Sequence, residues 1–199
     1  MMSSVQTSST LIGAIWATDE GMSPAARLFR LVVLAFAGSL LVAASAQITV
    51  PLWPVPMTLQ TFAVVLVGAA YGWRLGGATL ALYLAEGAIG LPVFAGGASL
   101  LALTGPTAGY LYGFVAAAAL VGWLTARGWD QSIVKSALAM SLGTALIFAG
   151  GLSWLSTFTG FEKAVEVGMI PFLPGAVLKI ALAVAVLPLA WKLVGKFRR

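Results

Sequence analysis

The chain is dominated by long apolar runs that are separated by short segments rich in glycine, proline or charged residues. The longer runs have about twenty residues, the length that an α-helix needs to cross a bilayer. The runs are continuous and do not alternate with polar positions, which favours helices over the strands of an outer-membrane barrel. The pattern predicts six membrane-spanning helices, at about residues 28–48, 58–71, 75–89, 108–126, 136–154 and 172–194.

The predicted fold class is therefore all-α, a polytopic membrane protein with one six-helix domain over residues 27–199. Residues 1–26 are rich in serine and threonine, and their one apolar run, Leu11 to Ala17, is too short to span. They lack the basic and long apolar parts of a signal peptide. We expect them to form a mobile cytoplasmic tail.

The composition fits this prediction, with 60% hydrophobic and 9% charged residues where a soluble domain has about a quarter charged. The chain contains no cysteine and no histidine, which excludes disulfides, thiolate chemistry and histidine-based metal sites or catalysis. The net charge is +5, but the basic residues are scattered near the ends of the spans, so nucleic acid is not an expected partner.

The basic residues also predict the orientation of the chain. Nine of the eleven fall on the side of the two termini, and basic residues accumulate on the cytoplasmic side of a membrane. We therefore expect both termini to be cytoplasmic and the chain to lie in the cytoplasmic (inner) membrane. The connections at residues 50–57, 90–106 and 155–175 then lie together outside, where we expect them to roof a cavity.

Lys179 is the most informative residue, because it lies about one turn inside the sixth predicted span. An ammonium group at membrane depth costs on the order of 2.5 kcal/mol or more, so such a residue usually faces a polar cavity and has a partner. That partner is either an anionic ligand or Glu86, the other ionisable residue well inside a span. A structural ion pair between Glu86 and Lys179 is thus the alternative to ligand capture.

Four further residues are candidates for a site near the outer ends of the spans. Gln60 offers donors and an acceptor to an amide-like ligand group, and Thr58 precedes it by two residues. The alternative is that Thr58 caps a helix and Gln60 bonds a neighbouring span. Phe94 and Tyr110, like Trp53, fit an interfacial aromatic belt. Phe94 lies among glycines that permit tight packing, so it also fits a lid.

Ala35, Ser39 and Ala43 recur at four-residue spacing in the first span and form a stripe of small residues. Such a stripe lets another helix approach closely, so we predict a contact with a partner, with packing inside the chain as the alternative. A transporter of this sequence would need a partner, because it has no nucleotide-binding loop. Gly195 and Lys196 are followed by Phe197 rather than by serine or threonine.

Five stretches, in one continuous order, carry a resemblance to a known family. The chain resembles the BioY family of biotin transporters, the substrate-binding S components of energy-coupling factor (ECF) transporters. The resemblance covers the chain from about Arg30 to its end. The matching stretches are Ala46 to Pro51, Pro54 to Thr61, Gly87 to Gly97, Gly105 to Tyr110 and Phe172 to Lys179.

The resemblance implies a six-helix protein that captures biotin from outside in a pocket near the outer surface. It also implies docking on a transmembrane coupling subunit driven by two cytoplasmic ATPases, with the small-residue stripe supplying the contact. By similarity, the candidate ligand contacts are Thr58, Gln60, Phe94, Tyr110 and Lys179. The chemistry of biotin suggests Lys179 for the carboxylate, Gln60 for the ureido group, and the two aromatic residues for the apolar body.

One departure from the family affects the polar end of the pocket. An aspartate commonly follows the proline-glycine pair in the family, whereas this chain has Ala176. Glu86 or a water would have to replace that carboxylate, so we include Glu86 among the expected substrate contacts.

Two other functions remain open at this point. One is an S component for a different vitamin. The other is an integral membrane enzyme such as a lipid phosphotransferase, which would need clustered acidic residues for a metal. The six carboxylates here are dispersed. We therefore expect a transport subunit without an ATPase site, a metal or a cofactor.

Overall fold

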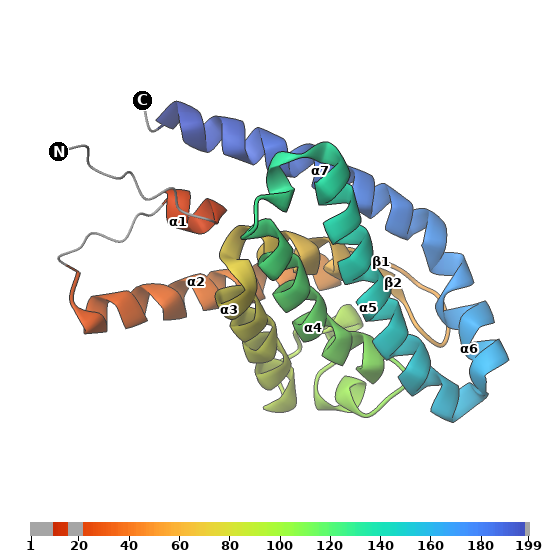
Figure 1. The fold of residues 1–199 in the computed structure, drawn as a ribbon. Helices are drawn as coiled ribbons and strands as arrows, with labels where there is room; N and C mark the ends of the chain where they lie inside the picture. The colour runs from red at the N-terminus through yellow and green to blue at the C-terminus, as the bar shows by residue number, and fades with distance from the viewer. Residues whose placement is uncertain (1–9, 16–21, 198–199) are drawn as a thin grey trace, which may run out of the picture.

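The computed structural model describes residues 10–15 and 22–197, which are mainly helical. The helices are α1 (Leu11–Ile15), α2 (Pro24–Ala46), α3 (Gln60–Ala88), α4 (Ala108–Thr125), α5 (Ile133–Thr159), α6 (Phe161–Gly168) and α7 (Leu173–Phe197) (Figure 1). Two short strands, β1 (Thr49–Val50) and β2 (Met57–Thr58), pair antiparallel. Single 3-10 turns lie at Ala95–Gly97, Leu100–Leu103, Trp129–Gln131 and Ile170–Phe172.

Five helical stretches in the described residues are long and apolar enough to cross a membrane. They are Pro24–Ala46, Gln60–Ala88, Ala108–Thr125, Ile133–Thr159 and Phe161–Trp191. Large apolar side chains cover the outer faces of α2 and α7, where Phe29 is 71% and Val177 is 67% exposed, as lipid-facing surfaces require. The protein is therefore an all-α, multi-pass membrane protein, as the apolar runs predict.

The helix α3 reverses direction at Gly72, where φ is 78° and ψ is 175°. Glycine adopts this conformation without steric cost. A Cβ built on Gly76 would lie 3.1 Å from the Cα of Gly68, whereas eight residues of a straight helix span about 12 Å. The two halves of α3 thus form a helical hairpin. The predicted division between the second and third spans is confirmed, and the described residues contain six spans when the two halves of α3 are counted separately.

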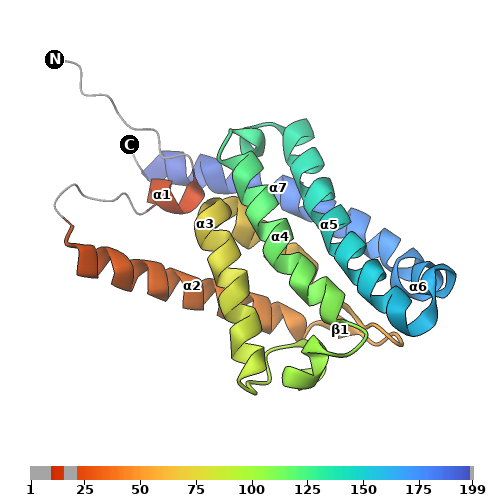
Figure 2. The same cartoon turned by 60° about the horizontal axis from the view of Figure 1, so that its bottom comes forward.

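Small residues let α3, α4 and α5 pack closely, with α4 between the other two in both views (Figures 1 and 2). A Cβ built on Gly68 would lie 2.5 Å from the carbonyl oxygen of Ala118 on α4. One built on Gly109 would lie 2.3 Å from the carbonyl oxygen of Gly150 on α5. Such backbone contacts leave no room for larger side chains. The three helices therefore form a closely packed centre that supports the connections at their ends.

The short helix α1 packs against α3 and α7. Leu11 is 4% exposed and lies in an apolar cluster with Val65, Ala69 and Leu187. Residues 1–9 and 16–21 of the predicted mobile tail lie outside the described residues, so for them the tail stays a prediction. The structure gives α1, within that segment, a defined place in the packing.

Candidate functional site

A cavity of about 370 Å³ lies at one end of the helices, where several connections meet. Its walls come from the connection after β1, the start of α3, the loop before α4, and parts of α4, α5 and α7. Its size suits a small organic ligand. Five of the six predicted ligand contacts line it, namely Thr58, Gln60, Phe94, Tyr110 and Lys179.

The cavity has one polar edge, which is organised around Thr58. The Nζ of Lys179 donates hydrogen bonds to the backbone carbonyl oxygen of Thr58 and, at 3.1 Å, to Oγ1 of Thr61. The Oγ1 of Thr58 donates to Oε1 of Gln60 at 3.0 Å and accepts from the backbone N–H of Gln60 at 3.2 Å. Thr58 therefore accepts from the first N–H of α3, whose N-cap is Leu59, and joins Lys179 and Gln60 into a single polar edge.

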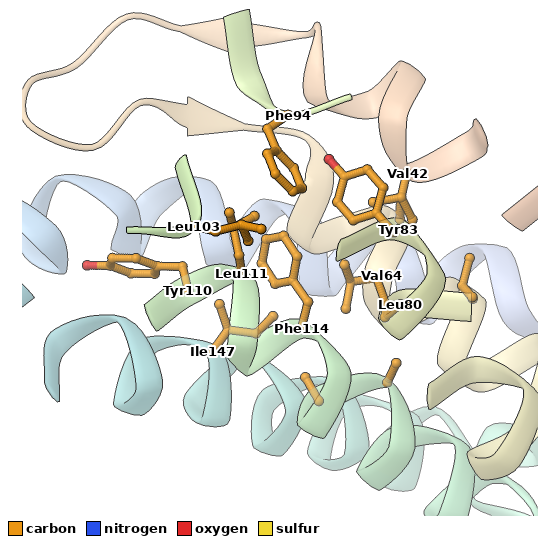
Figure 3. Packing of buried hydrophobic residues seen from close by; sticks show 14 of the residues in the cluster. Val42, Val64, Leu80, Tyr83, Phe94, Leu103, Tyr110, Leu111, Phe114 and Ile147 are labelled. Atoms are coloured by element: carbon orange, nitrogen blue, oxygen red, sulfur yellow. The ribbon is translucent and has the colours of Figure 1, made fainter. Parts of the chain in front are cut away.

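The remaining walls are mostly apolar and aromatic. Phe114 and Leu111 of α4, Ile147 of α5 and Phe172 line the space together with Phe94, and Figure 3 shows Phe94 close to Leu111 and Phe114. Such walls favour a ligand with an apolar body and few polar groups.

Tyr110 lines the cavity mainly as an aromatic surface. Its hydroxyl donates to the backbone carbonyl oxygen of Gly168 at 2.8 Å, so this donor is already used. The ring lies against α5, where a Cβ built on Gly151 would be 2.2 Å from two ring carbons. The bond and the close packing fix the ring between α4, α5 and the end of α6.

The Phe94 ring packs tightly against the end of α3. It is 2% exposed, which excludes the belt interpretation, whereas Trp53 is 89% exposed and fits it. The ring packs edge-on against that of Tyr83 with centroids 5.1 Å apart. A Cβ built on Gly87 would lie 2.1 Å from the Phe94 ring. Phe94 lines the cavity from this position, and its role as a lid stays a prediction.

Glu86 is the one predicted contact that the structure places away from the cavity. Its Oε2 accepts a hydrogen bond from Oγ of Ser39 on α2, and among the described residues it forms no ion pair with Lys179. The counterion alternative for Glu86 is therefore wrong, whereas its role as a ligand contact stays a prediction, for a side chain outside the cavity lining. The reason is that a hydroxyl on the neighbouring helix satisfies the carboxyl group locally.

The predicted partner contact at Ala35, Ser39 and Ala43 stays a prediction, and the three residues differ in how far they are buried. Ser39 is fully buried, Ala43 packs against the core, and Ala35 is half-buried. Ser39 therefore contacts α3 of the same chain, as the internal alternative expects, while Ala35 and Ala43 are partly exposed. Small residues at these positions leave room for the side chains of α3, including Glu86.

Two residues at the polar edge, Thr61 and Tyr83, were not predicted from the sequence. Thr61 lies in the first turn of α3, three residues after Thr58, and its hydroxyl beside the Thr58–Gln60 pair could have suggested it. Tyr83 binds Gln60 from 23 residues away, and no local pattern indicates that contact. Ala176, which takes the place of the family aspartate, lines the cavity, and among the described residues of the lining Lys179 is the only charged one. Within the described chain, no three acidic side chains are placed to hold a metal.

Comparison with known proteins agrees with this architecture. Residues 17–196 match the BioY family over most of the chain. The chain belongs to the BioY family. The probable biotin transporter BioY of Pyrococcus horikoshii is 38% identical over 147 residues, which cover 73% of this chain and 86% of the relative. The biotin transporter BioY of Thermotoga maritima is 37% identical over 147 residues, covering 72% of this chain and 85% of the relative.

A solved structure shares the fold of this BioY chain. It is the S component for biotin from an ECF-type ABC transporter, with a TM-score of 0.73 and 23% sequence identity. The match covers 86% of this chain and 95% of the solved one. The prediction from the sequence motifs that the chain resembles the BioY family is confirmed.

Proposed function

We propose that the chain binds biotin in this cavity and acts as the S component of an ECF transporter for biotin uptake. Its curated relatives are named biotin transporters. The observation that carries the proposal is the cavity itself, an aromatic space with one polar edge and one lysine. Biotin has an apolar bicycle and chain between a ureido group and a carboxylate, which match those walls and that edge.

The energy for uptake comes, in this proposal, from a transmembrane coupling subunit and two cytoplasmic ATPases, since the sequence has no nucleotide-binding loop. The chain itself is then no enzyme. It lies in the cytoplasmic membrane with both termini in the cytoplasm, as the distribution of basic residues favours.

Within the cavity, we assign the ammonium group of Lys179 to the carboxylate of biotin and the amide of Gln60 to the ureido group. Lys179 is the one cationic residue in the lining that the described residues form, and charge-assisted hydrogen bonds are the stronger ones. Phe94 and Tyr110 then contact the apolar body.

The shared polar edge also allows a second arrangement. Because Thr58 joins Lys179 to Gln60, the first arrangement requires the ligand chain to fold back so that both polar ends meet one edge. In the second, the ureido group contacts both residues and the carboxylate faces the cavity mouth. The two arrangements differ in whether Lys179 recognises a charge.

The decisive experiment measures binding of radiolabelled biotin by the purified chain, followed by uptake with the chain alone and together with coupling partners. We expect binding without partners and fast uptake only with them. Competition by unlabelled riboflavin or thiamine at similar concentrations would indicate an S component for another vitamin. A chain that binds no biotin would refute the proposal.

A further inference from the structure

Tyr83 does not line the cavity, yet it contacts two of the segments that do. It is fully buried in the second half of α3. Its hydroxyl donates to the backbone carbonyl oxygen of Val93 at 2.8 Å and lies 2.6 Å from Nε2 of Gln60. A tyrosine hydroxyl has one proton, and a carbonyl oxygen can only accept. The proton is therefore committed to Val93, and the hydroxyl oxygen must accept from Gln60.

This assignment fixes the orientation of the Gln60 amide. An amide can be turned by 180° unless its partners distinguish oxygen from nitrogen. Here Tyr83 requires the nitrogen on its side, and the hydroxyl of Thr58 donates to Oε1 on the other at 3.0 Å. One N–H and one oxygen lone pair of the amide remain for a ligand. A ureido group, with a donor next to an acceptor, fits that pair.

The same side chain also holds the loop that covers the cavity. The rings of Tyr83 and Phe94 meet edge to face at 88°, and Figure 3 shows the two rings side by side. Val93, whose carbonyl oxygen accepts from the Tyr83 hydroxyl, is the residue before Phe94. The next carbonyl oxygen, that of Phe94, accepts from Nε2 of Gln47 at 3.2 Å. Tyr83 is thus bonded both to the polar edge and to the loop.

We propose that Tyr83 is a positioning residue that couples ligand binding at Gln60 to closure of the Val93–Phe94 loop. A ligand that holds the Gln60 amide strengthens its bond to Tyr83, which is also the anchor of the loop. The inference rests on the proposed function only for the identity of the ligand, biotin.

The test replaces one hydroxyl and keeps the ring. Tyr83→Phe retains the contact with Phe94 but leaves the Gln60 amide without its fixed partner. The matched control is Tyr112→Phe, since the Tyr112 hydroxyl also donates to a loop carbonyl, that of Leu103 at 2.7 Å, but Tyr112 does not line the cavity. Each is measured for biotin affinity in the native and the Gln60→Leu backgrounds.

We expect Tyr83→Phe to weaken biotin binding by about tenfold to a hundredfold in the native background, and to have little further effect once Gln60 is leucine. Tyr112→Phe should leave the affinity unchanged in both backgrounds. An equal loss from Tyr83→Phe in both backgrounds would indicate a purely structural role and would overturn the proposal, as would no loss at all.

A second measurement does not depend on the folding of Tyr83→Phe. The chain has no cysteine, so Leu91→Cys provides a single reporter at a position that is 46% exposed. With biotin bound to saturation, we expect its reaction with a maleimide to slow in the otherwise native chain but not in the Gln60→Leu chain. Equal slowing in both chains, or none in either, would overturn the coupling while the proposed function stands. Failure of the native chain to bind biotin would refute the proposed function.

Discussion

Gly87 leaves room for the Phe94 ring, so Gly87→Ala is the most direct test of how the cavity is covered. The added methyl carbon would lie 2.1 Å from two ring carbons, whereas carbon atoms in contact are about 3.5–4.0 Å apart. The ring must therefore retreat by about 1.5 Å. Overpacking of this kind costs roughly 1–3 kcal/mol of stability.

Helix propensity acts in the opposite direction, since alanine is favoured over glycine by about 1 kcal/mol in a helix interior. Gly77→Ala controls for this term, because it lies in the same half of α3 and its Cβ would be 3.6 Å from that of Ala119, an ordinary contact. We expect Gly87→Ala to be less stable than Gly77→Ala by roughly 1–3 kcal/mol, or about 2–12 °C in unfolding midpoint. Thermal unfolding of both proteins in detergent measures the difference.

Biotin affinity should fall in Gly87→Ala as well, because the displaced ring changes the cavity wall. Phe94→Ala serves as the second arm, since removing the ring removes the clash. Adding Gly87→Ala to Phe94→Ala should then cost no further stability. If Gly87→Ala were as stable as Gly77→Ala and bound biotin with native affinity, the close contact between Gly87 and Phe94 would be refuted.

Two further predictions concern charged groups. Lys179→Met should weaken biotin binding by about tenfold or more and leave binding of neutral biotinamide unchanged, with the exposed Lys163→Met as a neutral control. An equal loss for both ligands would assign Lys179 to the ureido group instead. At Asp130, burial raises the carboxyl pKa and a hydrogen bond from the Trp191 indole partly opposes this. The folded protein therefore loses stability as the pH rises from about 4 through that raised pKa. In Asp130→Asn, the temperature of the unfolding midpoint should depend less on pH over this range. Parallel midpoint curves for the two proteins would contradict the assignment.

The parts of the fold that follow from the sequence have local causes. Apolar runs of spanning length predict helices wherever they occur, and the break between the runs at 58–71 and 75–89 coincides with the reversal at Gly72. The cavity residues were also predictable in part. Thr58 and Gln60 are polar residues at the start of an apolar run, and Phe94 is an aromatic residue in a glycine-rich connection. These ends and connections meet at the cavity.

The parts that the sequence could not predict depend on how one helix is rotated against another. Glu86 binds Ser39 rather than Lys179 because of the way α2 faces α3, and this orientation is a tertiary property. Tyr83 reaches Gln60 only because α3 folds back on itself. Neither contact leaves a periodic pattern in the sequence.

The place of α1 has a consequence for how the protein should be produced. The Cγ2 of Thr10 comes within 2.9 Å of where a Cβ of Gly72 would lie, so the turn in α3 has an N-terminal neighbour as well as an unusual conformation. The family match begins at residue 17, downstream of Leu11 and the apolar cluster that it completes. A protein expressed from the start of the homologous region would lack α1, which packs against α3 and α7. A shortened protein that keeps the contacts of Leu11 with α3 and α7 must therefore begin before residue 17, where the family match starts.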